Sequence, residues 1–262
     1  MKRWAALGAL ACATFARDAR ALDPFEIQVY DATANAPGEG GLELHLNRVA
    51  DGVRVGDGAL LPMHHQTHMT LEPSLGIFPW WELGAYFQTA LRADGTFDYA
   101  GVKLRSKFVT PPEWHPHLRL GANFELSIIP TVYDADRWGT EVRPIVAWED
   151  ASWLFAFNPI VGQSLGGSAG EGPSFEPALK AMHKIAGQLG VGFEYYGDFG
   201  PFGTILPWKE QRHYLYETID LLAVDRFELN AGLGEGLTPA SNGVTFKIIV
   251  GYGWDLLRMP RR

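Results

Sequence analysis

The chain has 262 residues, of which 47% are apolar and 13% aromatic, and its formal charge is -8. This composition excludes a disordered chain and fits one large β or α/β domain or two small ones. Lys and Arg number 22 against 30 Asp and Glu, and no basic run occurs before Arg261 and Arg262, so a nucleic-acid partner is not expected. No apolar run of about 18 residues follows the N-terminus, which excludes a bundle of transmembrane helices.

Residues 1–21 have the features of a secretory signal peptide. Lys2 and Arg3 form a basic start, residues 4–15 are apolar, and residues 19–21 (ARA) fit a cleavage site. The one cysteine, Cys12, follows a poor lipobox (ALA), so a lipoprotein signal is a less favoured alternative, as is a short buried helix. Export would leave an acidic chain that has no cysteine and therefore no disulfide.

The dominant pattern is an alternation of apolar and polar residues with a period of two. In residues 118–128 (LRLGANFELSI) every second residue is apolar, and the others are polar or glycine. Such alternation is typical of a strand with one apolar and one polar face. Similar runs occupy residues 69–77, 81–91, 100–108, 189–195 and 244–254, with shorter ones at 42–46 and 227–233. The chain is therefore predicted to be a succession of two-faced strands.

Strand length separates the two kinds of β protein that alternate in this way. Strands of a soluble sandwich usually have about five or six residues, whereas strands of an outer-membrane barrel need about nine to eleven. Most runs here are of the longer kind, and their apolar faces carry no charge. Aromatic pairs such as Trp80 and Trp81 lie near strand ends, where membrane interfaces favour them. We therefore predict an all-β fold, a single antiparallel transmembrane barrel in an outer membrane. A secreted sandwich or lipocalin-like barrel is the alternative.

Connection lengths predict the number of strands. Outer-membrane barrels alternate short periplasmic turns with longer external loops. The long connections are 50–66, 130–139, 158–174, 197–212 and 234–243; the short ones are 76–80, 149–152, 183–188 and 222–226; the pattern is unclear at 92–96 and 109–116. This parity predicts about twelve strands in a barrel of residues 41–262. Residues 25–32 (FEIQVYDA) would be a thirteenth strand, so residues 22–40 are expected to form a periplasmic or lumenal N-terminal extension. The alternative is that one of the twelve strands has been divided wrongly.

Three segments of the chain resemble a family of bacterial outer-membrane barrels. They are residues 23–47, 175–201 and 227–254, and the family is described as transporter-like and related to the phenol meta-pathway group. The likeness extends over most of the chain after residue 21 and consists of strand patterns, with no catalytic signature. It implies an outer-membrane barrel with a role in transport. One departure is that the chain continues past Trp254, whereas barrel chains often end on an aromatic residue.

No catalytic or cofactor motif stands out. Residues 64–68 (HHQTH) are the best metal-like cluster, but they lack a nearby carboxylate at helical spacing and belong to a predicted loop. Residues 115–117 (HPH) offer too few ligands. We therefore predict no metal, no cofactor and no enzyme activity. Ser164, Ser168 and Ser174 could serve a lipid-modifying hydrolase, although no spacing selects a catalytic triad.

The lumen is where function is expected. The candidate lumen-lining residues are Glu43, His45, Glu82, Tyr86, Lys103, Arg105, Lys107, Arg119, Glu125, Glu141, Arg143, Glu194, Glu228 and Lys247. Opposed charges either set the preference of a pore or cross-link a closed interior, and pairing is the favoured interpretation. Tyr86, Tyr99 and Tyr196 are expected on the same polar faces.

These features favour a passive or facilitated channel for a small solute, aromatic solutes included. A lipid-modifying enzyme, a structural or partner-binding barrel without transport, and a soluble secreted sandwich are the alternatives. The expected partners are outer-membrane lipid and the solute, and the oligomeric state is left open.

Overall fold

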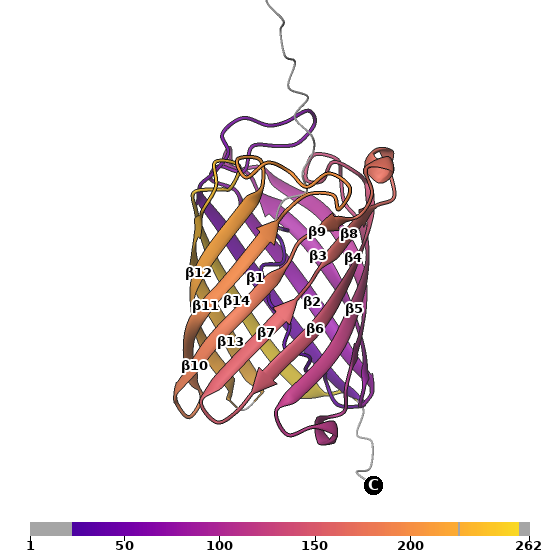
Figure 1. The fold of residues 1–262 in the computed structure, drawn as a ribbon, viewed down its shortest axis with the longest axis vertical. Helices are drawn as coiled ribbons and strands as arrows, with labels where there is room; N and C mark the ends of the chain where they lie inside the picture. The colour runs from indigo at the N-terminus through magenta and orange to yellow at the C-terminus, as the bar shows by residue number, and fades with distance from the viewer. Residues whose placement is uncertain (1–22, 225, 257–262) are drawn as a thin grey trace, which may run out of the picture.

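The computed structural model describes residues 23–224 and 226–256, so the predicted signal peptide and Cys12 lie outside the described residues. The strands form one antiparallel sheet that closes on itself (Figure 1). Two short 3-10 turns, η1 (Pro112–Trp114) and η2 (Gly167–Glu171), interrupt the loops. Within the described ranges, no helix has the length and apolar character needed to cross a membrane.

Strands that follow one another in the chain pair, except β7 with β8 and β9 with β10, and the last strand pairs with the first. The strands are β1 (Glu39–Asp51), β2 (Thr67–Phe78), β3 (Trp81–Leu91), β4 (Phe97–Val109), β5 (Leu118–Ile128), β6 (Trp138–Glu149), β7 (Trp153–Asn158), β8 (Val161–Ser164), β9 (Ser174–Phe175), β10 (Ala178–Ala186), β11 (Leu189–Asp198), β12 (Arg212–Val224), β13 (Phe227–Gly236) and β14 (Val244–Asp255).

Two of the strand positions in the ring are interrupted. β7 and β8 both pair with β6 and are separated by Pro159 and Ile160, while β9 and β10 are separated by Glu176 and Pro177. Proline has no N–H to donate to a ladder, so both breaks have a local cause. Counting each interrupted pair once, the fourteen segments make a closed barrel of twelve strands, which confirms the predicted fold.

The apolar faces of the strands point outward and the polar faces point into the lumen. Mid-strand residues such as Leu104 and Phe193 are 58% and 53% exposed, whereas Arg105 and Glu194 beside them are 4% and 2% exposed. A soluble sandwich would show the reverse, with its apolar faces packed together. The outer surface is therefore the lipid-facing belt of a transmembrane barrel. Glu217 is a charged exception on this belt, exposed between Leu215 and Ile219 of β12.

A β-bulge in β4 changes one prediction. Gln88 is opposite Gly101 but Thr89 is opposite Tyr99, so Ala100 is an extra residue in β4. Gly101 has a φ of 136°, which L side chains rarely adopt. Beyond the bulge the faces exchange: Ala100 is fully buried in the lumen, and Tyr99 is 60% exposed outside. The prediction that Tyr99 lies on the polar face was therefore wrong.

The two ends of the barrel differ in their connections. Residues 52–66, 129–137 and 199–211 are among the long loops at one end, and the turns 79–80, 150–152 and 187–188 are at the other (Figure 1). By the usual parity of outer-membrane barrels the long-loop end is external and the short-turn end periplasmic. The unclear connections follow the same order, since 92–96 is at the external end and 110–117 at the periplasmic end.

An aromatic cluster marks the periplasmic end of the belt. Phe78 and Trp80 stack with ring centroids 5.3 Å apart, and Trp81 and Phe108 stack at 6.1 Å. These amphipathic rings are suited to the boundary between acyl chains and head groups.

The outward face of β4 provides a test of membrane insertion. We expect Leu104→Lys to lower the free energy of unfolding in lipid vesicles by about 2 to 4 kcal/mol, because the ammonium group would face acyl chains near mid-strand. Urea titration followed by heat-modifiable gel migration measures this change. Leu104→Ala is the size control and should cost clearly less, while Glu217→Leu should stabilise the barrel. Equal effects of Lys and Ala at residue 104 would contradict a lipid-facing surface.

Candidate functional site

Residues 23–38 lie inside the lumen and are not part of the sheet (Figure 1). Asp23 lines a cavity together with Val53 and Val132 of the external loops, and the segment ends where β1 begins at Glu39 near the periplasmic turns. The segment therefore passes along the barrel from the external to the periplasmic end. We call residues 23–38 the lumenal segment. The sheet begins two residues before the expected boundary at residue 41.

Apolar side chains of the lumenal segment form the core of the molecule. Phe25 and Ile27 are each 2% exposed, and full burial of such a side chain contributes roughly 1.5–3 kcal/mol. The surrounding wall positions are small, which leaves room for the segment. Ile27 and Val29 pack with Ala147, Ala156 and Ala178, and Phe25 packs with Ala90 and Ala100.

Side chains of the wall satisfy the backbone of the lumenal segment. The Asn158 amide accepts a hydrogen bond from Tyr30 N (2.7 Å) and donates one to Tyr30 O (2.9 Å), as a neighbouring strand would. Other wall side chains donate to carbonyl oxygens of the segment: Asn47 to Pro24, Thr70 to Phe25, Lys247 to Ile27 and Arg119 to Asp31. These bonds replace a β-ladder and hold the segment from several sides of the barrel.

The most acidic ion-pair group surrounds Glu26 of the lumenal segment, whose carboxylate is buried. Its Oε1 is 3.0 Å from Arg143 and its Oε2 is 3.5 Å from Lys103. Lys103 also pairs with Asp23 and with Glu125, and Arg143 pairs with Glu141. The carboxylates Asp23, Glu26, Glu125 and Glu141 thus surround only Lys103 and Arg143. This part of the lumen has more carboxylates than cationic side chains.

Three further groups of ion pairs line the lumen. In one, Arg105 contacts Glu72 at 2.6 Å and Glu82 at 2.7 Å, and Lys107 contacts Glu82 at 2.9 Å. The members of the second are Lys180, Glu194, Asp220 and Lys247, and those of the third are Asp31, Arg119, Glu149 and Lys184. Pairing of this kind is what buried charges require.

The structure brings most of the predicted lumen-lining residues together in these groups. The buried ones are His45, Glu82, Tyr86, Lys103, Arg105, Glu125, Arg143, Glu194 and Lys247; the half-buried ones are Glu43, Lys107, Arg119 and Glu141. Glu228 is exposed to solvent and lines the periplasmic cavity. Sequence reasoning missed the other members of these groups: Asp23, Glu26, Asp31, Glu72, Glu149, Lys180, Lys184 and Asp220. Of these, Glu72 lies on the polar face of the predicted strand 69–77, so its lumenal position could have been found.

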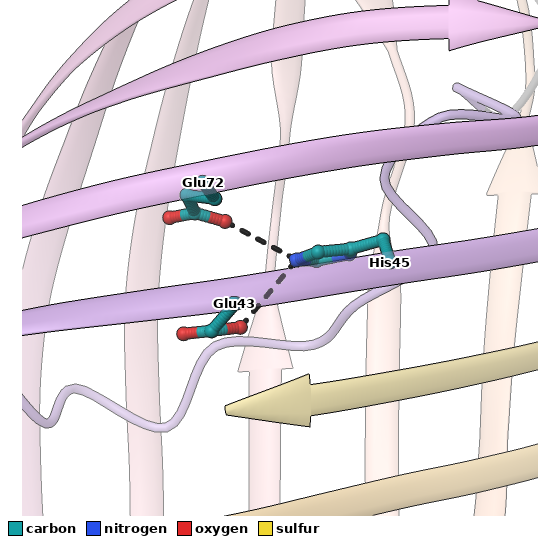
Figure 2. Close-up of side chains that lie close together, drawn as sticks. All are labelled: Glu43, His45 and Glu72. Atoms are coloured by element: carbon teal, nitrogen blue, oxygen red, sulfur yellow. Dashed lines mark ion pairs between the residues drawn. The ribbon is translucent and has the colours of Figure 1, made fainter. Parts of the chain in front are cut away.

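The three histidines of residues 64–68 lie in two different places. His64 and His65 stack in an external loop with ring centroids 3.8 Å apart, while His68 lies in the lumen and bonds Gln66. A different set of potential ligands converges in the described part of the chain: Glu43 and His45 of β1 with Glu72 of β2 (Figure 2).

Two cavities lie at opposite ends of the lumen and share no lining residue. The external cavity, of about 180 Å³, has Lys103, Glu125 and Glu141 in its floor. Its wall is largely apolar and includes Phe25, Val53, Val55, Leu60, Leu61, Met63 and Val132. The periplasmic cavity, of about 300 Å³, is lined by polar residues that include Glu43, Glu82 and Lys107. Between them, the Tyr30 hydroxyl of the lumenal segment bonds that of Tyr86.

Asp136 fixes the loops over the external cavity. Its carboxylate accepts hydrogen bonds from Gly167 N (2.7 Å), Ser168 N (3.0 Å) and the hydroxyls of Ser164 and Ser168. Burial opposes ionisation, but these donors outweigh it and lower the pKa of Asp136 to about 2. The serines considered for a hydrolase therefore hold a loop carboxylate, and Ser174 donates to Glu176.

This depressed pKa predicts how the external loops respond to acid. The stabilisation from ionised Asp136 is fully present above the unfolded pKa near 4 and is lost as the pH falls through about 2. We expect amide exchange at Gly167 and Ser168, corrected for intrinsic rates, to accelerate over this range. In Asp136→Asn, protection should be lower at neutral pH and nearly independent of pH. An unchanged protection profile in that variant would contradict the assignment.

The closed ring, the apolar belt and the charged interior define an outer-membrane β-barrel, which confirms the predicted class and location. No protein-family model matches the chain, and no curated protein matches it. Among solved structures it is similar to an outer membrane channel from Pseudomonas putida F1, with 11% identity, a TM-score of 0.58 and coverage of 87% of this chain and 100% of that chain. It is also similar to the KdgM porin, with 8% identity, a TM-score of 0.52 and coverage of 81% and 98%. At these identities the likeness establishes the fold.

Proposed function

We propose that this protein is an outer-membrane channel for small solutes, closed in the described conformation by the lumenal segment. The observation that carries the proposal is the pair of cavities at opposite ends of one lumen, with Tyr30 of that segment between them. The segment belongs to no strand and is held by side chains. Its displacement would therefore leave the ladders of the barrel intact.

The external cavity indicates the class of solute. Its wall is largely apolar, and the group of charged residues at its floor contains four carboxylates, Asp23, Glu26, Glu125 and Glu141, against two cations. Such a surface favours a small solute with an apolar or aromatic part that is neutral or cationic, and disfavours an anion. The proposed relation to the phenol meta-pathway group agrees with a neutral aromatic solute. Outer-membrane lipid is the other proposed partner.

Loosening the lumenal segment tests the channel. We expect Asn158→Ala to raise conductance in planar bilayers several-fold above that of the unaltered protein, because Tyr30 loses both backbone hydrogen bonds to the wall. Uptake of phenol or benzylamine by proteoliposomes should rise in parallel. Asn230→Ala removes a lumenal amide that bonds Glu194 and Asp220, so it should have a much smaller effect. Absence of both conductance and uptake in all three proteins would refute a channel.

Charge selectivity tests the proposed solute class. Under a salt gradient the reversal potential of Asn158→Ala should show a preference for cations, because the acidic floor attracts them. Adding Glu141→Gln should reduce this preference, since Glu141 lines the external cavity. Glu217→Gln, which changes a carboxylate on the outer face, is the matched control and should leave the reversal potential unchanged. A preference for anions would contradict the proposed class.

A further inference from the structure

Three side chains with metal-binding groups meet on the lumenal faces of β1 and β2. Glu43 and Glu72 are direct partners in the antiparallel ladder between these strands, and His45 lies two residues after Glu43 on the same face. The alternation of the strand and the register of the pair together place one imidazole and two carboxylates beside one another. Figure 2 shows His45 Nε2 directed toward an oxygen of each carboxylate.

The distances among the three groups suit a small divalent cation. His45 Nε2 is 3.4 Å from Glu43 Oε2 and 3.2 Å from Glu72 Oε2, and the three ligand atoms lie within 4.8 Å of one another. In a tetrahedral zinc site with bonds of about 2.0–2.2 Å, neighbouring ligand atoms are about 3.3–3.6 Å apart. An ion can therefore contact all three groups with little rearrangement of the strands.

Burial without hydrogen-bond partners is a second, independent observation. His45 is 0% exposed and Glu72 is 1% exposed. Within the described structure, His45 Nε2 and Glu72 Oε2 make no hydrogen bond of good geometry, and their polar contacts are those with one another and with Glu43. Buried polar atoms of this kind are rare and usually indicate a bound water or ion. His45 Nε2 and Glu72 Oε2 face each other across 3.2 Å.

The local charge also calls for a cation. With a neutral imidazole, the ion-pair group around the site contains Glu43, Glu72 and Glu82 against Arg105 and Lys107. A divalent ion would compensate the unbalanced carboxylate, as would a proton on His45. The ion would bind His45 Nε2 and both carboxylates at once, whereas a proton on Nε2 would be donated to the carboxylates as a hydrogen bond.

The two carboxylates of the site have outer hydrogen-bond partners, whereas His45 Nδ1 has none within the described structure. Arg105 Nε holds the second oxygen of Glu72 at 2.6 Å, and Gln28 Nε2 donates to Glu43 Oε2, the oxygen that faces His45, at 3.0 Å. Such outer contacts orient carboxylate ligands toward an ion. Glu43 also lines the periplasmic cavity, which gives an ion and a water ligand access to the site.

We propose that Glu43, His45 and Glu72 bind one divalent transition-metal ion of the zinc class, reached from the periplasmic cavity. One imidazole with two carboxylates is a ligand set that suits zinc and cobalt, and a water would complete four-coordination. The proposal does not depend on transport, since all three ligands belong to the wall strands β1 and β2.

The proposal is tested by removing bound metal from the full chain in detergent with EDTA and then titrating the protein with Co²⁺ and Zn²⁺. We expect one equivalent of Co²⁺ to give the visible bands of a low-coordinate site, and Zn²⁺ to abolish them. Zn²⁺ should also raise the temperature at which the folded band is lost on gels. Glu72→Gln and His45→Asn should weaken binding by at least about tenfold. His68→Asn, which removes another buried lumenal histidine, should bind like the unaltered protein.

Two outcomes would overturn the site. One is the absence of stoichiometric binding in a folded barrel, together with an NMR signal showing that His45 is an imidazolium at neutral pH, because the proton would then be the compensating charge. The other is unchanged binding in His45→Asn, which would place the ion elsewhere. Glu43→Gln gives a further variant at a half-buried position if the buried substitutions impair folding, and it should also weaken binding.

Discussion

The hydrogen bonds between β1 and β14 determine the rest of the structure. Their ladder extends from Glu39 and Asp255 at one end to Asp51 and Val244 at the other, and it removes the free edges of the sheet. Acyl chains cannot satisfy a backbone N–H or C=O, so a sheet in a membrane must close. After closure every residue of a strand faces either lipid or lumen. Nearly all mid-strand charges consequently lie inside, where their partners must also be found.

The interior of the barrel is a core built around an extension of the chain. Twelve strands enclose more space than the wall side chains fill, and the lumenal segment occupies it. Small wall residues such as Ala147 and Ala156 accommodate Ile27, while Asn158 and Lys247 satisfy the backbone. The same contacts stabilise the barrel and separate its two cavities. A channel of this design would open at a cost in stability.

Local sequence patterns made the strands predictable. The contacts between strands and within the lumen could not be predicted, because they depend on residues that are far apart in the chain. The runs 81–91 and 118–128 coincide with β3 and β5, because alternation reports which face each residue occupies. The bulge at Ala100 has no signature in composition, so the face of Tyr99 was predicted incorrectly. The pairing of Glu72 with Glu43 was not predictable in this way, because it depends on the register of two strands. The sequence could not decide whether residues 22–40 form a periplasmic or a lumenal extension, because the residues that hold the segment in the lumen, such as Asn158, are far from it in the chain.

The direction of the lumenal segment constrains how the barrel is assembled. Asp23 lies among the external loops, whereas Glu39 begins the wall at the opposite end, so the chain descends through the ring before it enters the sheet. A ring that had already closed could receive this stretch only lengthwise, with residue 23 leading. Alternatively, β14 joins β1 while residues 23–38 are already surrounded by the curling sheet. In either order, seating of the N-terminal stretch and the final ladder are topologically linked steps of biogenesis.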